Sequence, residues 1–190
     1  MIQAIFFDVD GTLVSFRTHT IPPSALEALH ALRAKGIKLF LATGRHQAML
    51  RSVQELFPFD GCVTLSGQYC FVGSRVLRSS PMPPEAVEEL VAAAEGGAFS
   101  RWHPNFLDVI PPTGGKDLGM DAILDHFGIP VENCMAFGDG ENDLSMLVHA
   151  GIGVAMGTAS DAVKAQADYA APSVDEDGIA HTLSHFGLIP

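Results

Sequence analysis

The sequence is short of cysteines and of basic residues, and each shortage excludes a class of protein. Its three cysteines, Cys62, Cys70 and Cys134, are far apart and form neither a C-x-x-C pair nor a Cys/His cluster. We therefore expect no disulfide framework and no zinc site, but three buried apolar side chains in a reducing compartment. Lysine and arginine number 11 against 22 for aspartate and glutamate, so the surface lacks the positive field that nucleic acid or anionic lipid would need.

Long apolar segments are absent as well. No apolar run reaches the ~18 residues that a membrane-spanning helix needs, and the N-terminus has no basic segment followed by the apolar core of a signal peptide. No internal repeat or low-complexity segment is evident. With 190 residues, of which 47% are hydrophobic, the chain can form one domain with a sizeable core, with or without a modest insertion. We expect a globular, cytoplasmic protein with neither nucleic acid nor membrane as a partner.

What the sequence does contain is an alternation of apolar strands and helices. The first strand, "AIFF" at residues 4–7, is apolar without a period of two, which is typical of a parallel strand covered on both faces. Further strands are expected at 37–45, 62–67, 134–140 and 152–156. Helices are expected at 20–36, 46–58, 116–128, 142–151, 160–167 and from about 178. This alternation predicts right-handed crossovers and a parallel sheet sandwiched by helices, which is an α/β fold.

The alternation is interrupted between Ser66 and Pro112. The segment "YCFVGSRVL" at 69–77 predicts a hairpin that turns at Gly73-Ser74, while residues 83–97 predict a short helix and residues 106–112 one more strand. We therefore expect a core domain made of residues 1–66 and 112–190, with residues 67–111 as an insertion above the sheet.

Polar residues follow several of the predicted strands at one edge of the sheet. They are Asp8 and Asp10 in "DVDGT", Thr43 in "LATGR", Lys116 in "GGKD", and Asp139, Asn142 and Asp143 in "GDGEND". In open α/β sheets, ligands bind at the carboxyl ends of the strands. Carboxylates that converge there repel each other unless a cation lies between them, and a hard divalent ion such as Mg²⁺ suits their oxygens. The sequence therefore predicts a magnesium site.

The same groups suit a phosphoryl group. A metal ion, a lysine, a hydroxyl and the backbone N–H groups of the Gly11-Thr12 turn can together neutralise the charge on its oxygens. Asp8 is the candidate nucleophile, because attack by an aspartate on phosphorus forms an aspartyl-phosphate and divides one difficult displacement into two easier ones. Asp10, two positions along, is the candidate general acid for the leaving group and later the base for the hydrolytic water.

The order of these segments identifies a family. "DVDGTLV", "LATGR", "GGKD" and "GDGENDLSML" resemble, in that order, the four motifs of the haloacid dehalogenase superfamily of magnesium-dependent phosphatases. The stretches "FLDVIPPTGGKD" and "VAMGTASDAVKAQADYAAPSVDEDGIAHTL" resemble its Cof-type, or type IIB, branch. The resemblance covers nearly the whole chain. It implies a Rossmann-like sheet with the first motif on a central strand, and a phosphatase that acts on a small phosphorylated metabolite such as a sugar phosphate.

The resemblance also implies a role for each motif residue. Asp8 would be the nucleophile and a metal ligand, and Asp10 the acid/base, with its backbone carbonyl on the metal. Asp139 would bind Mg²⁺, and Asp143 would support the ion directly or through water. The phosphoryl group would be held by Gly11, Thr43, Gly44, Lys116 and Asn142, and the lysine would also neutralise Asp8. For Arg45, a structural ion pair and a contact with the substrate both remain open.

Two other classes of protein fit parts of this pattern. A receiver domain of a signalling protein also has strand-end carboxylates, a phosphorylatable aspartate, a Thr/Ser and a lysine, and it acts as a binding switch. Asp10 argues against a switch, because an acid/base next to the nucleophile promotes turnover whereas a switch needs its phosphate to persist. A catalytically silent phosphate-binding protein on the same fold is the second alternative, and the presence of every motif residue argues against it.

The predicted insertion is much shorter than the cap of the family. Full Cof-type members carry a whole α/β cap domain between the second and third motifs, and a cap excludes water and contacts the substrate. Trp102 and His103 are candidates for contact with a substrate or for packing of the shortened cap. We expect a homo-oligomer in which the 69–77 hairpin and the 106–112 strand of one subunit cover its neighbour's site. The alternative is a monomer with an open site for bulky phosphorylated substrates.

Overall fold

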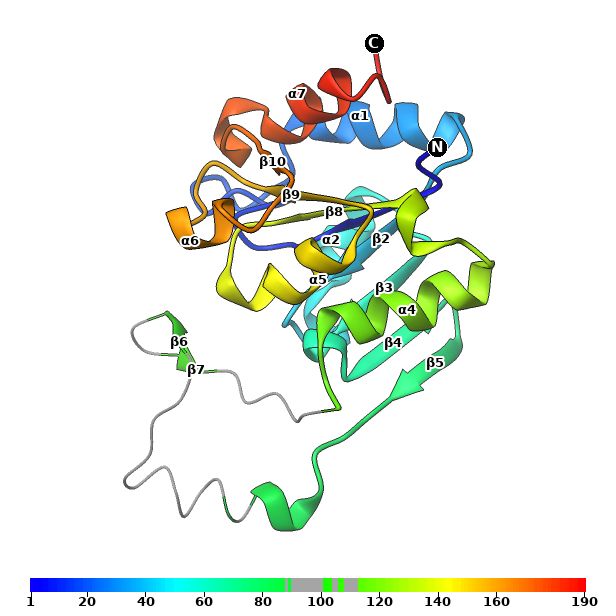
Figure 1. Ribbon diagram of the computed structural model, residues 1–190. Coiled ribbons are helices and arrows are strands. Elements are labelled where there is room, and N and C mark those ends of the chain that lie inside the picture. Colours follow the sequence, from blue (N-terminus) through cyan, green and yellow to red (C-terminus); the bar gives the residue numbers. More distant parts are fainter. Residues whose placement is uncertain (88, 90–100, 104–105, 108–112) are drawn as a thin grey trace.

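The computed structural model describes residues 1–87, 89, 101–103, 106–107 and 113–190. Its main feature is one eight-stranded sheet with the order β10-β9-β8-β1-β2-β3-β4-β5 (Figure 1). The strands are β1 (Ala4–Phe7), β2 (Lys38–Ala42), β3 (Gly61–Thr64), β4 (Tyr69–Val72), β5 (Arg75–Ser79), β8 (Cys134–Gly138), β9 (Ile152–Ala155) and β10 (Tyr169–Ala170). The first motif strand, β1, lies in the middle and pairs in parallel with both β2 and β8.

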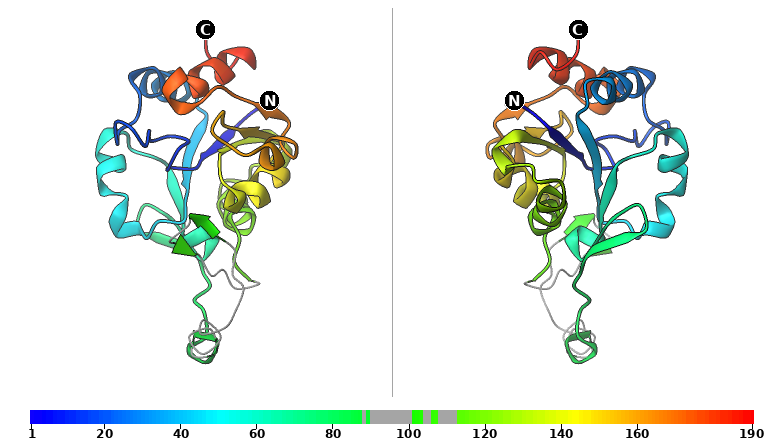
Figure 2. Two further views of the ribbon diagram at one scale, coloured as in Figure 1. Left: turned by 90° about the vertical axis from the view of Figure 1, so that its left-hand side faces the viewer. Right: turned by 90° about the vertical axis from the view of Figure 1, so that its right-hand side faces the viewer.

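Helices cover both faces of the sheet, as the two side views of Figure 2 show. One face packs against α1 (Pro23–Ala34), α2 (Arg51–Leu56) and α7 (Gly178–His185), and the other against α4 (Lys116–Phe127), α5 (Leu144–His149) and α6 (Asp161–Lys164). Along β1, Ile5 and Phe7 belong to the first hydrophobic core, and Ala4 and Phe6 to the second. The apolar run of β1 is unbroken because both of its faces are buried. The predicted α/β fold with a mainly parallel, helix-flanked sheet is confirmed.

Short 3-10 turns modify two of the predicted helices. The segment expected as one helix at 46–58 forms η1 (Gln47–Met49) and then α2, because the His46 ring nitrogen accepts a hydrogen bond from Ala48 N–H and caps a tight first turn. The segment expected at 142–151 begins as η4 (Glu141–Asp143) and continues as α5. The other short turns are η2 (Leu65–Gly67), η3 (Val131–Asn133) and η5 (Val174–Glu176).

The hairpin predicted at 69–77 forms, with its turn at Gly73-Ser74 between β4 and β5. Its expected place in an insertion above the sheet is wrong, because both strands belong to the main sheet. Strand β4 pairs antiparallel with β3 and β5 pairs with β4, which adds both strands to the core sheet. Cys70 on β4 is buried against α4, where Gly119 leaves room for its sulfur. Burial of this face stabilises the hairpin on the main sheet.

The rest of the predicted insertion lies mostly outside the described residues. Within it, residues 84–87 are helical, and the strands β6 (Arg101–His103) and β7 (Phe106–Leu107) form a two-stranded antiparallel pair. The remainder of the expected helix at 83–97 and of the expected strand at 106–112 falls on residues that are not described. The division into 1–66 with 112–190 and 67–111 stays a prediction, with its hairpin now assigned to the core sheet.

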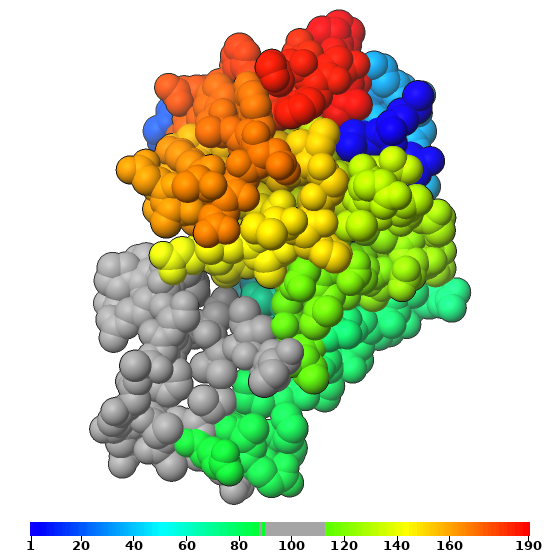
Figure 3. All heavy atoms as spheres, in the orientation of Figure 1, coloured from blue at the N-terminus to red at the C-terminus, as the bar shows by residue number. Residues whose placement is uncertain are grey.

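The structure also bears on two expectations that came from composition, the state of the cysteines and the hydropathy of the helices. Cys62, Cys70 and Cys134 are free and buried, as expected of apolar side chains. Among the described residues, no helix combines the length and the hydropathy needed to cross a bilayer. In the space-filling view of Figure 3, the C-terminal segment and the described start of the insertion lie at opposite ends of the molecule.

Candidate active site

Asp8 lies at the centre of the carboxyl edge of the sheet, directly after β1. Its N–H donates to the Phe137 carbonyl on β8, which fixes the position of the residue between β8 and β2. The chain then folds back on itself, since the N–H groups of Leu13 and Val14 both donate to the Val9 carbonyl. Gly11 has φ +86° in this turn, a conformation that side-chain-bearing residues rarely adopt. The motif glycine is therefore required by the backbone.

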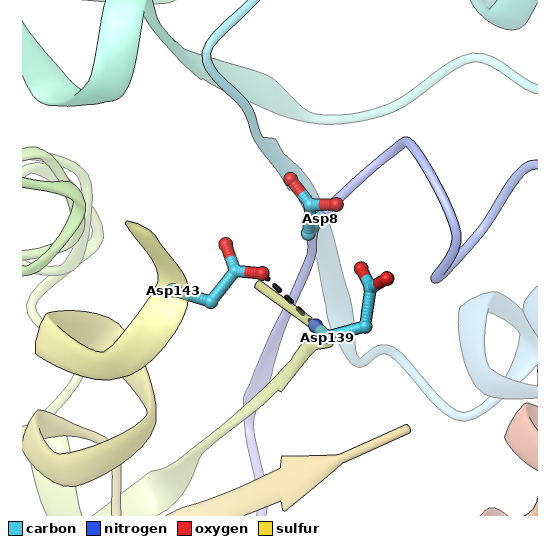
Figure 4. Close-up of side chains that lie close together, drawn as sticks. All are labelled: Asp8, Asp139 and Asp143. Atoms are coloured by element: carbon cyan, nitrogen blue, oxygen red, sulfur yellow. Dashed lines mark hydrogen bonds between the residues drawn. The ribbon is translucent and has the colours of Figure 1, made fainter. Parts of the chain in front are cut away.

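Three carboxylates converge at this edge (Figure 4). Asp8 comes from β1, Asp139 from the end of β8 and Asp143 from η4, and one oxygen of each lies within 4.8 Å of the others. Asp143 is held in place because its Oδ2 accepts hydrogen bonds of 2.9 Å from the N–H groups of both Asp139 and Gly140. Asp139 is oriented by Thr12, whose hydroxyl donates to its Oδ1 at 3.0 Å.

Lys116, the first residue of α4, neutralises part of this charge. Its ammonium group is buried and donates to Asp8 Oδ1 at 2.6 Å and also to Asp143 Oδ1. Burial alone would lower the pKa of Lys116, but the charges of Asp143 and Asp8 outweigh it and raise that pKa above its ordinary value. A solvated lysine at a helix start would make no such contacts. Three carboxylates and one ammonium leave two formal negative charges in the cluster.

The donor set fits a divalent cation of the magnesium type. Burial and the charge of Asp143 raise the pKa of Asp8 well above its ordinary value, and the same two causes raise that of Asp139 to about 6. Both directions have the same physical cause, the cost of ionising a buried carboxyl group beside a second carboxylate. Bonds of ~2.1 Å in an octahedral site place ligand oxygens about 3 to 4 Å apart, which matches oxygens within 4.8 Å of one another. Asp8, Asp139 and Asp143 can therefore hold Mg²⁺.

The side chain of Asp10 points to a different partner. Arg45 forms a two-pronged ion pair with it, Nε to Oδ2 at 2.8 Å and Nη2 to Oδ1 at 2.5 Å. The Asp10 carboxylate is not among the three that converge, so only its backbone carbonyl remains as a candidate metal ligand. Of the two interpretations left open for Arg45, the structure shows the ion pair.

Thr43 lies at the end of β2, next to the Asp10–Arg45 pair. Its buried hydroxyl accepts the N–H of Arg45 at 3.1 Å, which leaves its own O–H to donate to a phosphoryl oxygen. Gly44 stands between these two residues. Asn142 lies in η4, and a Cβ on Gly140 would collide with its side-chain oxygen. For Trp102 and His103 the structure describes only the backbone, in β6.

Sequence reasoning missed the loop that follows β3. Leu65 and Ser66 both have φ +51°, which is unusual for two successive residues other than glycine. The loop is held against the site because Leu65 N–H donates to the Arg45 carbonyl and Ser66 N–H to the Thr43 carbonyl. The local signal was the position of "LSG" directly after a predicted strand, at the same edge as the other motifs. The role of the Thr12 side chain was also missed, and no local pattern indicates it.

Comparison with known proteins follows this geometry. The model of the haloacid dehalogenase-like hydrolase family matches residues 5–98 and 93–183. Among solved structures, the HAD subclass IIB sugar phosphatase BT4131 superposes with a TM-score of 0.92 at 37% identity, covering 98% of this chain and 100% of that one. BT1666 from Bacteroides thetaiotaomicron superposes with a TM-score of 0.88 at 30% identity, covering 100% of this chain and 96% of that one.

A relative of known sequence adds information about the insertion. Pyridoxal phosphate phosphatase YbhA of Escherichia coli is 26% identical over 265 aligned positions, which include 95% of this chain and 97% of the relative. The alignment has more positions than the 190 residues of this chain. The relative therefore contains segments without a counterpart here. The family match itself is divided at residues 93–98, inside the predicted insertion.

Proposed function

The chain belongs to the haloacid dehalogenase-like hydrolases, as a phosphatase of the Cof-type subclass IIB, and we propose that it hydrolyses a phosphomonoester of a small metabolite through an aspartyl-phosphate on Asp8. A sugar phosphate is the proposed substrate class, which the similarity to a sugar phosphatase supports. The observation that carries the proposal is the cluster of Asp8, Asp139, Asp143 and Lys116 at the carboxyl edge of the sheet, in which all but the half-buried Asp139 are buried. Membership of a hydrolase family excludes the receiver-domain alternative.

In the proposed mechanism Asp8 attacks phosphorus with the oxygen that Lys116 does not hold. Lys116 fixes Oδ1 of Asp8 at 2.6 Å, so Oδ2 forms the new P–O bond while the bond to the leaving oxygen breaks. Mg²⁺, held by Asp8, Asp139 and Asp143 with the Asp10 carbonyl, would stabilise the negative charge on the transferring group. Thr43 donates its O–H to a phosphoryl oxygen, and the N–H of Gly44 and the side chain of Asn142 complete the binding of the other oxygens. The N–H of Gly11, which the sequence assigns to the phosphoryl group, instead donates to the Val14 carbonyl at 3.0 Å and closes the turn after Asp10.

Asp10 serves both halves of the reaction. It gives a proton to the leaving-group oxygen in the first step, and in the second it takes a proton from the water that attacks the phosphorus of the aspartyl-phosphate. Hydrolysis then releases inorganic phosphate and restores the Asp8 carboxylate. The two hydrogen bonds from Arg45 orient the Asp10 carboxylate, and they must loosen when Asp10 carries its proton.

A panel of phosphorylated sugars, nucleotides and cofactors tests this function. We expect turnover of at least one monoester with Mg²⁺, its loss with a chelator, and its loss in Asp8→Asn, which keeps the shape of the side chain. Turnover that survives both treatments would contradict the mechanism. Binding of phosphate without turnover of any ester would instead indicate a silent binding protein.

The shortened cap is the second part of the proposal. Since β4 and β5 belong to the core sheet, we place the start of the insertion after Ser79. The division of the family match at residues 93–98 and the longer alignment with YbhA support the loss of cap segments within it. A short cap excludes less water from the site, so residues of the core must supply contacts to the leaving group.

A further inference from the structure

Phe16 is an exposed aromatic side chain beside the candidate active site. It is 61% exposed to solvent. A single exposed apolar residue is ordinary on a protein surface and by itself needs no explanation. Two further observations distinguish Phe16: the way in which its backbone is held, and the groups that lie next to its ring.

The turn that presents Phe16 is held by hydrogen bonds to the buried Ser15. The preceding residue, Ser15, is fully buried, and its hydroxyl donates to Asp175 at 2.7 Å while accepting the N–H groups of Arg17 and Thr18. Ser15 N–H also donates to the Thr20 carbonyl at 3.1 Å. The backbone on both sides of Phe16 is therefore fixed, and its ring is held at the surface by a built turn.

The ring lies against the first motif. A Cβ on Gly11 would come within 2.6 Å of Phe16 Cε2 and would collide with Asp139 Oδ2. The edge of the Phe16 ring and the Asp139 carboxylate of the candidate metal site thus both lie beside the Cα of Gly11. Gly11 directly follows Asp10, the proposed acid, so the ring lies beside the backbone of the turn that carries Asp10.

The in-line geometry of phosphoryl transfer places the leaving group on the side of the site where Asp10 lies. In phosphoryl transfer the attacking and leaving oxygens lie on opposite sides of phosphorus. Asp8 is buried, whereas the Asp10 side chain is 41% exposed, so a leaving group opposite Asp8 points toward Asp10 and the solvent. A flat apolar surface beside that path favours a leaving group that has a flat face of its own.

We propose that Phe16 is a specificity residue whose ring packs against the leaving group and favours phosphomonoesters of ring-shaped alcohols, such as hexoses, over those of short open-chain alcohols. This inference depends on the proposed phosphatase function. In this proposal the turn at residues 15–20 of the core domain contacts the substrate and selects it, as a full cap does in longer members of the family.

The test is the ratio of kcat/KM for glucose 6-phosphate to kcat/KM for glycerol 3-phosphate, with Mg²⁺. We expect Phe16→Ala to lower this ratio by roughly three- to tenfold, the range for loss of one aromatic packing contact, and Phe16→Trp to preserve it. Val148→Ala is the control. Val148 is also 61% exposed, but it comes shortly before the amino end of β9, at the edge of the sheet opposite the candidate active site. This control should leave the ratio as it is in the unaltered chain.

The same ratio is measured for binding, as dissociation constants of the two esters in the Asp8→Asn background. A ratio that Phe16→Ala leaves unchanged, even where both rates fall, overturns the role of Phe16 and shows that its ring only packs against the chain. Turnover of both esters in that case leaves the phosphatase function intact. A protein that neither binds nor hydrolyses these two esters but hydrolyses another ester of the panel overturns this inference alone, and one that hydrolyses no ester of the panel overturns the proposed function with it.

Discussion

At the scale of single residues, two carboxylates close together in the chain have different surroundings and hence different proposed tasks. Asp8 is buried, contacts Lys116 and lies among the carboxylates that can hold a metal. Asp10 is more exposed and is paired with Arg45. The arrangement separates the proposed nucleophile from the proposed acid/base, although only one residue stands between them in the sequence.

Asp10→Asn tests the second of these tasks. We expect a loss on the order of 10²–10⁴ in rate for an alkyl phosphate, whose poor leaving group needs a proton, and a smaller loss for 4-nitrophenyl phosphate, whose leaving group does not. The affinity for Mg²⁺ should be largely kept, because the Asp10 carboxylate lies outside the cluster of three. Steady-state kinetics with both esters and a magnesium titration measure these effects. A near-normal rate with the alkyl phosphate would exclude the acid/base role.

Lys116→Met tests the charge balance of the cluster. Removal of one member of a buried ion pair typically destabilises a protein by about 3 kcal/mol or more, and here it leaves Asp8 and Asp143 without their ammonium partner. We expect a lower Tm in chelator, a larger rise of Tm on addition of Mg²⁺ than in the unaltered chain, and a loss of at least ~10² in kcat. Lys35→Met, at the exposed end of α1, is the control. Equal responses of both variants to Mg²⁺ would contradict the cluster as the metal site.

At the scale of elements, the position of Lys116 depends on a contact between two loops. Gly67, with φ +87°, lies so close to the Gly115 backbone that a Cβ would collide with the Gly115 carbonyl. Gly115 is the residue immediately before α4, and its own carbonyl accepts the N–H of Gly119. The loop after β3 and the start of α4 are thus in direct contact, so η2 sets the place at which Lys116 enters the site.

Gly67→Ala tests this contact, with Gly73→Ala as its matched control. Both glycines have positive φ, but a Cβ on Gly73 would meet no atom within 4 Å. Each substitution should lower the free energy of unfolding by about 1 kcal/mol through backbone strain. Only Gly67→Ala should also displace the start of α4 and lower kcat. Chemical denaturation and kinetics of the two variants separate strain from displacement, and equal kcat values would disprove the positioning effect.

At the scale of the whole molecule, the question is whether a second subunit covers the candidate active site. A homo-oligomer and the interface expected for it stay predictions, but only β5 of the hairpin offers a sheet edge, since β4 is an interior strand of the core sheet. Strand β5 is an edge of that sheet and carries Arg75 and Arg78, and charged residues on an edge strand oppose pairing with a second copy.

Light scattering at assay concentration tests the oligomer. If a neighbouring subunit covers the site, activity should fall on dilution together with the measured mass, because the covered site is lost when the subunits part. A monomer of constant mass that is fully active on small phosphates would exclude this prediction. It would leave the ring of Phe16 as the proposed contact for the leaving group.

Much of the fold and of the candidate site could be predicted from the sequence because the relevant chemistry is local. An unbroken apolar run such as "AIFF" and a glycine after a helical period such as Gly128 indicate a strand and a helix end from neighbouring residues alone. The motif residues were found because strand ends of a parallel sheet meet at one edge. Convergence of Asp8, Asp139 and Asp143 follows from that topology.

Contacts between distant segments were decided only by the tertiary structure. A hairpin pattern is the same whether its strands form a separate sheet or extend an existing one, and the choice depended on burial of Cys70 against Gly119 of α4. The partner of Arg45, the approach of Gly67 to Gly115 and the place of the Phe16 ring beside Gly11 likewise join residues that no sequence period relates. The sequence by itself determined which groups carry the chemistry, because residue type and strand position are local properties. The packing of the folded chain decided which of these groups touch, because such contacts depend on how elements far apart in the chain fit together in space.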